Sequence, residues 1–216
     1  MSEFPKTPRN RVKRLPKRAE YDRDVVYAVV DSAPICHVGF VQDGQPFVLP
    51  TIHARLDDTL IIHGSTASRM MKALGGGSEL CVTVTHLDGL VLARSAFHHS
   101  MNYRSAVLFG RGEIIKDQAE KLAALEAVSE LLVPGRWAEI RRPTEQELKA
   151  TTVVRMLIES ASVKSRAGDP IDDEADYSLP IWAGVLPISA TPGALRADAR
   201  LDPAVPIPMH LAVFEH

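Results

Sequence analysis

The residues best suited to bind a small molecule lie between His63 and Arg69, in the run His-Gly-Ser-Thr-Ala-Ser-Arg. Apolar residues before this run predict a strand, and the residues after it predict a short helix. Gly64 lets the backbone approach a ligand closely, and the first amides of a helix that begins near Thr66 attract an anion. Arg69, and Lys72 one helical turn later, add positive charge. The run therefore predicts a phosphate site, although an ordinary helix N-cap followed by a solvated Arg69 explains the same residues.

Two histidines stand on predicted strands next to this run. Alternation along residues 47–54 places Thr51 and His53 on one face of their strand. His63 ends the next strand, so its imidazole is expected at the rim of the fold beside the phosphate loop. An imidazole there serves either a ligand or a structural hydrogen bond, and the sequence leaves both roles open.

A third polar cluster occupies residues 93–105 and includes Ser95, His98, His99 and Arg104. Polar groups at this density are costly unless they serve a site or an interface. The two histidines raise the question of a metal centre. Adjacent strand residues point to opposite faces, and no carboxylate or cysteine stands at ligand spacing, so we predict no metal site. An ion pair of Arg104 with an acidic residue is the simpler interpretation.

The composition excludes several classes of function. Lys and Arg total 25 against 27 Asp and Glu, and this balance gives no broad attraction to nucleic acid or to anionic membranes. Cys36 and Cys81 form no CxxC pair, so neither a disulfide scaffold nor a zinc knuckle is expected. No apolar run reaches the ~18 residues that span a bilayer. We expect a cytoplasmic protein with no nucleic-acid or membrane partner.

The elements that position these residues are mostly strands. The pattern predicts a helix over 22–31 and then strands over 35–41, 46–55 and 60–63, with a hairpin turn at Asp43-Gly44. A second hairpin is predicted from 79–85 and 90–97, turning at Leu87-Asp88-Gly89, and a long strand from about 103 to 115. Further segments are a helix after Asp117, a short helix from Thr144 and β structure over 153–165. Consecutive hairpins favour a mainly β, antiparallel barrel with peripheral helices.

Three regions follow from the changes in composition along the chain. Residues 1–21 form a basic N-terminal arm, which we interpret as solvated, and residues 22–188 form the barrel domain. Residues 189–216 form a proline-rich extension that wraps the surface or a partner subunit. Within the helix after Asp117, the spacing predicts that Leu122, Leu125, Val128 and Leu132 face inward.

An ordered set of motifs resembles a known family. These motifs are PFVLPT, LIIHGSTASRMMKAL, LCVTVTHLDGLVLARSAFHHSMNYRSAVLFGRGE and VKSRAGDPIDDEADYSLPIWAGVLPI, which together cover about residues 22–188. They are similar to the flavin-nucleotide-binding branch of the pyridoxamine-5′-phosphate-oxidase-like proteins, whose relatives include the 5-nitroimidazole resistance proteins. The resemblance implies an FMN-binding split β-barrel and a homodimer with FMN in each of two clefts between the subunits.

The resemblance also implies which residues hold the flavin. Arg69 stands where relatives usually carry a phosphate-binding lysine, which is a departure from the family pattern. Trp182 is expected to stack on or close over the site, from either protomer, or to be a buried structural residue. The implied cofactor-binding residues are Pro50, Thr51, His63, Gly64, Ser65, Ser68, Arg69, Ser95, Ala96 and Trp182.

The function that follows is an FMN-dependent oxidoreductase acting on a small flat organic compound. Vitamin B6 oxidation is disfavoured, because the C-terminal arginine and histidine signature of that enzyme is not found. No catalytic residue is assigned, since the flavin itself carries the electrons. The alternatives are a non-catalytic flavin-binding protein for storage or sensing, and a barrel of the same type that holds haem or a deazaflavin.

Overall fold

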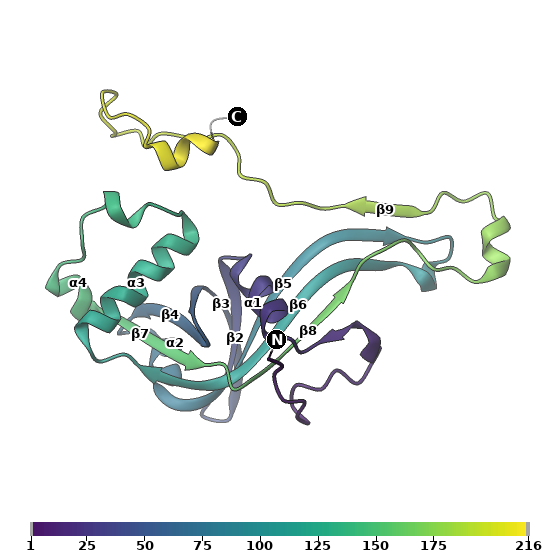
Figure 1. Cartoon of the computed structure of the whole chain (residues 1–216), viewed down its shortest axis with the longest axis horizontal. Helices are drawn as coiled ribbons and strands as arrows, with labels where there is room; N and C mark the ends of the chain where they lie inside the picture. Colours follow the sequence, from purple (N-terminus) through teal and green to yellow (C-terminus); the bar gives the residue numbers. More distant parts are fainter. Residues whose placement is uncertain (1, 215–216) are drawn as a thin grey trace.

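The computed structural model describes residues 2–214 (Figure 1). The strands in these residues are β1 (Ala19–Glu20), β2 (Ile35–Gln42), β3 (Gln45–Leu56), β4 (Thr59–Ser65), β5 (Gly76–Leu92), β6 (Ser100–Ile114), β7 (Thr151–Leu157), β8 (Ser160–Arg166) and β9 (Gly184–Pro187). The α-helices are α1 (Arg23–Asp31), α2 (Arg69–Gly75), α3 (Gln118–Leu132) and α4 (Glu145–Ala150). Short 3₁₀ turns are η1 (Pro16–Arg18), η2 (Ala96–His98), η3 (Trp137–Glu139), η4 (Glu174–Ser178) and η5 (Met209–Phe214).

The sheet closes into a ring. Its strand order is β1-β8-β6-β7-β4-β3-β2-β5-β9, and an additional pairing joins β6 to β5. Strands β5, β2, β3, β4, β7 and β6 therefore form a closed antiparallel barrel, while β1, β8 and β9 extend it. This confirms the predicted mainly β, antiparallel split barrel. Closure leaves no free edge within the ring, so the barrel strands satisfy one another's backbone groups.

Two hydrophobic cores hold the barrel. The larger core fills the ring and continues under α1 and α2, and it includes Val38, Leu60, Ile62, Leu108 and Met156. The smaller core lies on the outer face of β3, β4 and β7, where α3 packs, and contains Ala54, Ile61, Ile115, Ala124, Val128 and Val153. Successive residues of β4 thus serve opposite faces, as strand geometry requires.

The first hairpin turns as predicted, and the second does not. Asp43 has φ 52° and Gly44 has φ 76°, which is the backbone of a type I′ turn between β2 and β3. The predicted turn at Leu87-Asp88-Gly89 is wrong. There β5 continues through a register shift to Leu92, and the chain reverses only between Leu92 and Ser100. Arg104 on β6 donates two hydrogen bonds to the Asp88 carboxylate at 3.0 and 2.9 Å, which explains how an Asp-Gly pair is accommodated in a β-bulge.

The helices follow the predicted ranges with one correction. Asp117 caps α3 by accepting a hydrogen bond from the Glu120 amide at 2.9 Å, and Thr144 with Glu147 forms a capping box on α4. On α3, however, Ala124 and Val128 are the buried residues, while Leu132 is 45% exposed. The predicted inward stripe is confirmed at Val128 and at Leu125, which packs against the small outer core, and it is wrong at Leu132.

The N-terminal arm is not free in solvent, so its interpretation as a solvated segment is wrong. Phe4 is buried in the main core, and β1 pairs with β8. Asn10, also buried, donates to the carbonyl oxygens of Pro5 and Ala161 at 2.9 Å in both cases. These contacts hold the backbone of the arm along β8, while most of its basic side chains remain exposed.

Strands β5 and β6 extend well beyond the barrel as a two-stranded projection, with β9 paired along its outer part (Figure 1). After β9 the chain runs back toward α3, apart from the barrel, and ends in η5. Every residue from 186 to 207 is exposed. We call residues 186–207 the C-terminal strap. Its end is attached by His210, whose Nδ1 lies 3.3 Å from a carboxylate oxygen of Glu139.

Candidate functional site

The loop between β4 and α2 contains the predicted phosphate-binding residues. Three of its amides are already bonded within the chain: Thr66 N to Ala150 O at 3.0 Å, Ala67 N to Ser65 Oγ at 3.2 Å and Ser68 N to Ser65 O at 2.9 Å. The helix begins at Arg69 rather than near Thr66. An anion at this loop would therefore be held mainly by side chains and not by the amides of residues 66–68.

Two side chains at the start of α2 remain available. Ser68 is the N-cap residue, but its hydroxyl makes no capping hydrogen bond. Arg69 is exposed and forms no ion pair within residues 2–214, while its guanidinium carbon lies 5.2 Å from the centre of the Phe47 ring. A hydroxyl donor next to an unpaired guanidinium is suited to a phosphate oxygen.

The predicted residues of β3 and β4 come together at this end of the barrel. The ladder between the two strands runs from Leu56–Thr59 to His53–Ile62, so Thr51 and Gly64 both lie just beyond its last pair. Pro50 is exposed on the outer face of β3, and Thr51 is half-buried. Gly64 packs against α2, where an added Cβ would lie 3.0 Å from Cγ of Met71. Seven of the ten predicted residues thus lie near one another along β3, β4 and the start of α2, but the side chain of one of them, His63, points to the other side of β4 into a separate cavity. The other six are Pro50, Thr51, Gly64, Ser65, Ser68 and Arg69.

The other three predicted residues lie elsewhere in the chain. Ser95 and Ala96 follow β5, which begins directly after α2 and whose 17 residues span roughly 50 Å at the usual rise of a strand. Trp182 precedes β9 and is 70% exposed, so it is not a buried structural residue of this chain. One chain does not bring these residues to the β4–α2 loop.

The tip of the β5–β6 projection is nevertheless an ordered structure. Arg94 pairs with Asp172 at 3.0 Å, and the Asp172 carboxylate also accepts a hydrogen bond from the Arg94 amide at 3.0 Å. The Asp172 side chain is fully enclosed, and hydrogen bonds from Arg94 keep the pKa of this carboxyl below its usual value despite the opposing effect of burial. Next to this pair, the hydroxyl of Ser95 is buried without a hydrogen-bond partner. The tip therefore presents an unsatisfied donor.

His63 faces the opposite side of β4 from Gly64. It lines a cavity of about 480 Å³ between the outer face of the barrel and the layer formed by α3, η3 and α4. Most of the lining is apolar and includes Ile52, Leu125, Val128, Trp137 and Leu148. At the rim, the Arg141 guanidinium hydrogen-bonds to Glu147 and lowers the pKa of that carboxyl to about 2.

The imidazole of His63 has an unusual environment within this cavity. Its Nδ1 is buried and has no hydrogen-bond partner. Burial lowers the pKa of His63, so the ring is neutral near pH 7. A neutral imidazole without a partner at the wall of an apolar cavity is able to coordinate a metal ion or accept a hydrogen bond from a ligand.

Sequence patterns missed the residues that complete this cavity. Trp137 and Arg141 lie in the connection between α3 and α4, where no periodicity marks an inward face. A tryptophan two residues after Pro134-Gly135 was the available signal, because a large aromatic residue in a connection is often buried. Trp137 is indeed 5% exposed.

His53 does not join the site, contrary to the polar stripe expected with Thr51. It is fully buried, and its Nε2 lies 3.1 Å from the carbonyl oxygen of Val30 at the end of α1. This histidine therefore has a structural role inside the barrel core.

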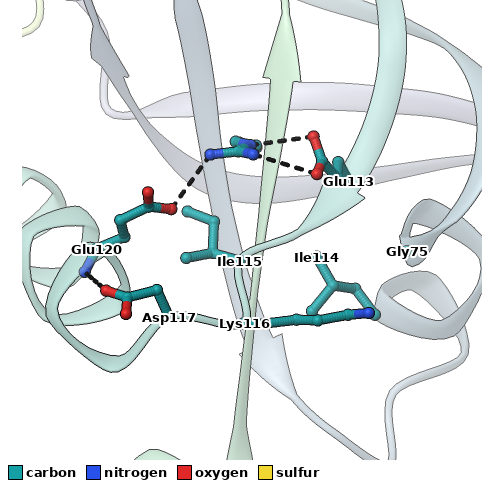
Figure 2. A pocket seen from close by; sticks show the side chains of 8 residues that line it. Gly75, Glu113, Ile114, Ile115, Lys116, Asp117 and Glu120 are labelled. Atoms are coloured by element: carbon teal, nitrogen blue, oxygen red, sulfur yellow. Dashed lines mark hydrogen bonds and ion pairs between the residues drawn. The ribbon is translucent and has the colours of Figure 1, made fainter.

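Another hollow, of about 490 Å³, lies between α2, α3 and the end of β6 (Figure 2). Its charged groups neutralise one another. Arg155 hydrogen-bonds to Glu113 at 3.1 Å through each of two nitrogens and to Glu120 at 3.2 Å. Figure 2 shows both carboxylates directed at the same guanidinium, so this hollow is a surface ion-pair network rather than a ligand site.

Residues 2–214 contain no group of three or more His, Cys, Asp or Glu residues placed to hold a metal ion. None of the helices in this range is long and apolar enough to cross a membrane.

Two solved structures match nearly the whole chain. The flavocytochrome of Azotobacter vinelandii is 42% identical, with a TM-score of 0.91 and coverage of 99% of both chains. The FAD and haem binding protein of Mycobacterium smegmatis is 36% identical, with a TM-score of 0.87, and the match covers 92% of this chain and 97% of that one. Both matches therefore include the projection and most of the terminal segments.

A more distant match shares the fold alone. The 5-nitroimidazole antibiotic resistance protein of Bacteroides thetaiotaomicron has a TM-score of 0.58 at 22% identity, and the match covers 68% of this chain and 85% of that one. No curated protein matches the sequence. The family model described as pyridoxamine 5′-phosphate oxidase matches residues 22–165, two thirds of the chain. With the closed split barrel, this match confirms the predicted resemblance: the chain belongs to the pyridoxamine 5′-phosphate oxidase family.

Proposed function

We propose that this protein is a flavin-dependent redox protein that binds its flavin at the end of the barrel where β3, β4 and α2 meet. The observation that carries the proposal is that Arg69 forms no ion pair within residues 2–214 and that the hydroxyl of the preceding Ser68 makes no capping hydrogen bond. Both groups are suited to bind the phosphate of a flavin nucleotide. The exposed Pro50 and the half-buried Thr51 offer backbone and apolar contacts for the flat ring. Two relatives above 35% identity are named as a flavocytochrome and as an FAD and haem binding protein.

FAD is the flavin that we propose. The sequence resemblance implied FMN, whose phosphate the same loop would hold. FAD is favoured because the M. smegmatis relative, which is similar over 92% of this chain, is named for FAD. The absorption spectrum of the purified protein, followed by mass analysis of the released ligand, tests both points. A flavin spectrum with released FAD is expected, released FMN would return the assignment to the sequence prediction, and a colourless protein that takes up neither flavin would contradict the proposal.

A second cofactor, haem, is favoured by the environment of His63. A haem site needs an apolar slot and an axial ligand, and the cavity of about 480 Å³ offers apolar walls with a histidine that has no hydrogen-bond partner. The cavity size lies within the range of ~300–1,000 Å³ typical of small-molecule sites. His63 would ligate the iron, while Trp137 and Leu148 would pack against the macrocycle. Haem would supply one-electron chemistry beside the flavin.

His63→Ala tests this assignment. The variant should lose the Soret band of haem-loaded protein, since the axial ligand is removed, while the barrel keeps its melting temperature within a few degrees. His99→Ala is the matched control, because His99 is exposed on the β5–β6 projection. A Soret band that is identical in His63→Ala and the wild type would remove His63 from a haem site.

We further propose that the flavin lies between two copies of the chain. Ser95 and Ala96, which the family resemblance assigns to the flavin site, are separated from α2 by the whole length of β5. A second copy can supply them. The exposed apolar residues of the outer β2–β3 face, Ile35, Val41, Val48 and Pro50, would be covered in such a dimer. The dimer would also cover the C-terminal strap, which exposes four large apolar side chains: Leu195, Leu201, Val205 and Ile207.

Catalysis of a reaction on a small flat organic compound is the activity that we propose, with storage or sensing of flavin as the alternative. An assay that supplies the protein with NADH, NADPH or dithionite as reductant and a nitroaromatic compound or a quinone as acceptor distinguishes the enzyme from the non-catalytic protein. Multiple turnovers support an enzyme. Reduction without turnover of any acceptor supports the non-catalytic alternative.

A further inference from the structure

A hollow of about 470 Å³ lies where the N-terminal arm meets the chain after β8, away from the proposed flavin loop. Lys17 and Arg18 of η1 line one side, and Arg166, Pro170 and Ile171 line the other. All five residues lie outside residues 22–165, the part of the chain that matches the family model. Apart from Ser165 at the end of β8, these residues of the hollow therefore lie outside the matched part of the chain.

The positive charges at this hollow have no carboxylate partners. Within residues 2–214, neither Lys17 nor Arg18 forms an ion pair. Arg166 donates hydrogen bonds to neutral oxygens only: the carbonyls of Gly168 at 2.9 Å and Asp169 at 2.7 Å, and the Asn102 side chain. Glu20 and Asp169 also line the hollow, but neither contacts these cations through its carboxylate.

The cations are close enough to disfavour one another. Burial and then the nearby charge of Arg18 lower the pKa of Arg166, an unusual direction for an arginine, and the weaker opposing attraction of the Asp169 carboxylate does not cancel them. Like charges held together cost free energy, and a bound anion reduces this cost.

The backbone holds this arrangement in place. The β1–β8 ladder pairs Ala19 with Lys164, so Arg18 is fixed directly beside the end of β8. Leu15, just before η1, has φ 56°, a left-handed conformation that is unfavourable for a residue with a side chain. The turn that presents Lys17 and Arg18 is thus specified by the fold rather than by local preference.

We propose that this hollow binds the phosphate of a nucleotide. Lys17, Arg18 and Arg166 contact the phosphate, whose double negative charge matches a cluster of three cations better than a carboxylate does. The volume exceeds that of a phosphate alone. Pro170 and Ile171, the latter 71% exposed, offer an apolar surface on which the base packs. The phosphate belongs either to a free nucleotide or, if the proposed flavin site and dimer hold, to the adenylate half of an FAD whose flavin is bound by a second copy. In one chain, roughly 30 Å of β6 separates Arg166 from α2.

Calorimetric titration with adenosine 5′-monophosphate tests the proposal, with adenosine as the uncharged control ligand. One sample holds saturating FMN and the other saturating FAD. Adenosine monophosphate binding to both samples identifies a free nucleotide as the ligand. Binding only to the FMN sample identifies the adenylate half of FAD, since FMN lacks it. Binding to neither sample overturns the proposal, and this outcome is independent of whether either flavin binds.

The variants locate the binding. The double variant Lys17→Ala/Arg18→Ala should weaken adenosine monophosphate binding at least tenfold, and neither side chain makes a hydrogen bond whose loss would unfold the arm. Arg14→Ala is the matched control, because Arg14 is exposed on the same arm but does not line the hollow. Added salt should weaken wild-type binding. Equal affinity of the wild type and the double variant would overturn the assignment.

Discussion

The imidazoles of His53 and His63 are both enclosed, and burial lowers the pKa of each below its ordinary value of 6.5. The unfolded chain regains the ordinary pKa. Below about pH 6.5 the unfolded chain therefore binds more protons than the folded one, and the free energy of unfolding falls as pH decreases. Each histidine makes the free energy of unfolding change by at most ~1.4 kcal/mol per pH unit. Above the ordinary pKa neither state binds the proton, so the free energy of unfolding no longer changes with pH through this group.

His53→Gln should reduce this pH dependence, because glutamine keeps a donor near the Val30 carbonyl but does not titrate. The measurement is urea unfolding at a series of pH values between about 5 and 8. His99→Gln, a substitution at an exposed histidine, serves as the control and should keep the wild-type slope. A His53→Gln protein whose stability varies with pH as steeply as the wild type would show that the buried imidazole is not responsible.

Arg69→Ala should weaken flavin binding by about 1.5–3 kcal/mol if the guanidinium contacts the flavin phosphate. The affinity is measured by quenching of flavin fluorescence. Arg111→Ala provides the comparison, since Arg111 is an exposed arginine that pairs with Glu79 at 2.7 Å on the β5–β6 surface. Unchanged flavin affinity in Arg69→Ala would remove this residue from the site.

At the level of elements, the position of α2 depends on a glycine of β6. An added Cβ at Gly112 would lie 2.2 Å from the carbonyl oxygen of Leu74 at the end of α2. Gly112→Ala should therefore push α2 off the barrel, lower stability by about 1–3 kcal/mol and weaken flavin binding through displacement of Arg69. Thermal unfolding and flavin titration check this. Gly193→Ala, where an added Cβ meets nothing within 4 Å, should leave both unchanged.

Several strands of the barrel were predictable from sequence because buried and exposed residues alternate in them, as along β6, or because they end at a turn that needs positive φ, as at Asp43-Gly44. The second hairpin was not. Leu87-Asp88-Gly89 satisfies the residue preferences of a turn and of a bulge equally, and only the cross-strand contact of Asp88 with Arg104 distinguishes them. The exposure of Leu132 on α3 was missed for a related reason: helical periodicity does not reveal how small a surface the helix has to cover.

The candidate site was predictable in part. Residues near His63 in sequence also lie near it in space, because a strand, a loop and a helix follow one another there. Long-range relations were beyond sequence patterns: the cavity formed with Trp137, the burial of His53 under α1, and the separation of Ser95 from Arg69 by β5. These depend on which faces pack together once the ring has closed.

For the whole molecule, the proposed dimer predicts a specific contact between copies. A photo-crosslinker placed at Leu201, in the C-terminal strap, should label the outer β2–β3 face of a second chain. Chains labelled with ¹⁴N and ¹⁵N are mixed, dissociated and reassociated, and crosslinked peptides are analysed by mass. Peptides that join strap and face with one label from each chain are expected. The dimer would be contradicted if both peptides of every crosslink carried the same isotope label and the protein had the mass of a monomer in solution.

The central claim is that a flavin occupies the end of the barrel beside β3, β4 and α2. A crystal structure grown with FAD tests it most directly. The expected density places the flavin ring against Pro50 and Thr51 and a phosphate within hydrogen-bond distance of Ser68 and Arg69. The claim would be contradicted by density for FAD at another surface of the protein. It would also be contradicted if the β4–α2 loop held no ligand in crystals grown with saturating FAD.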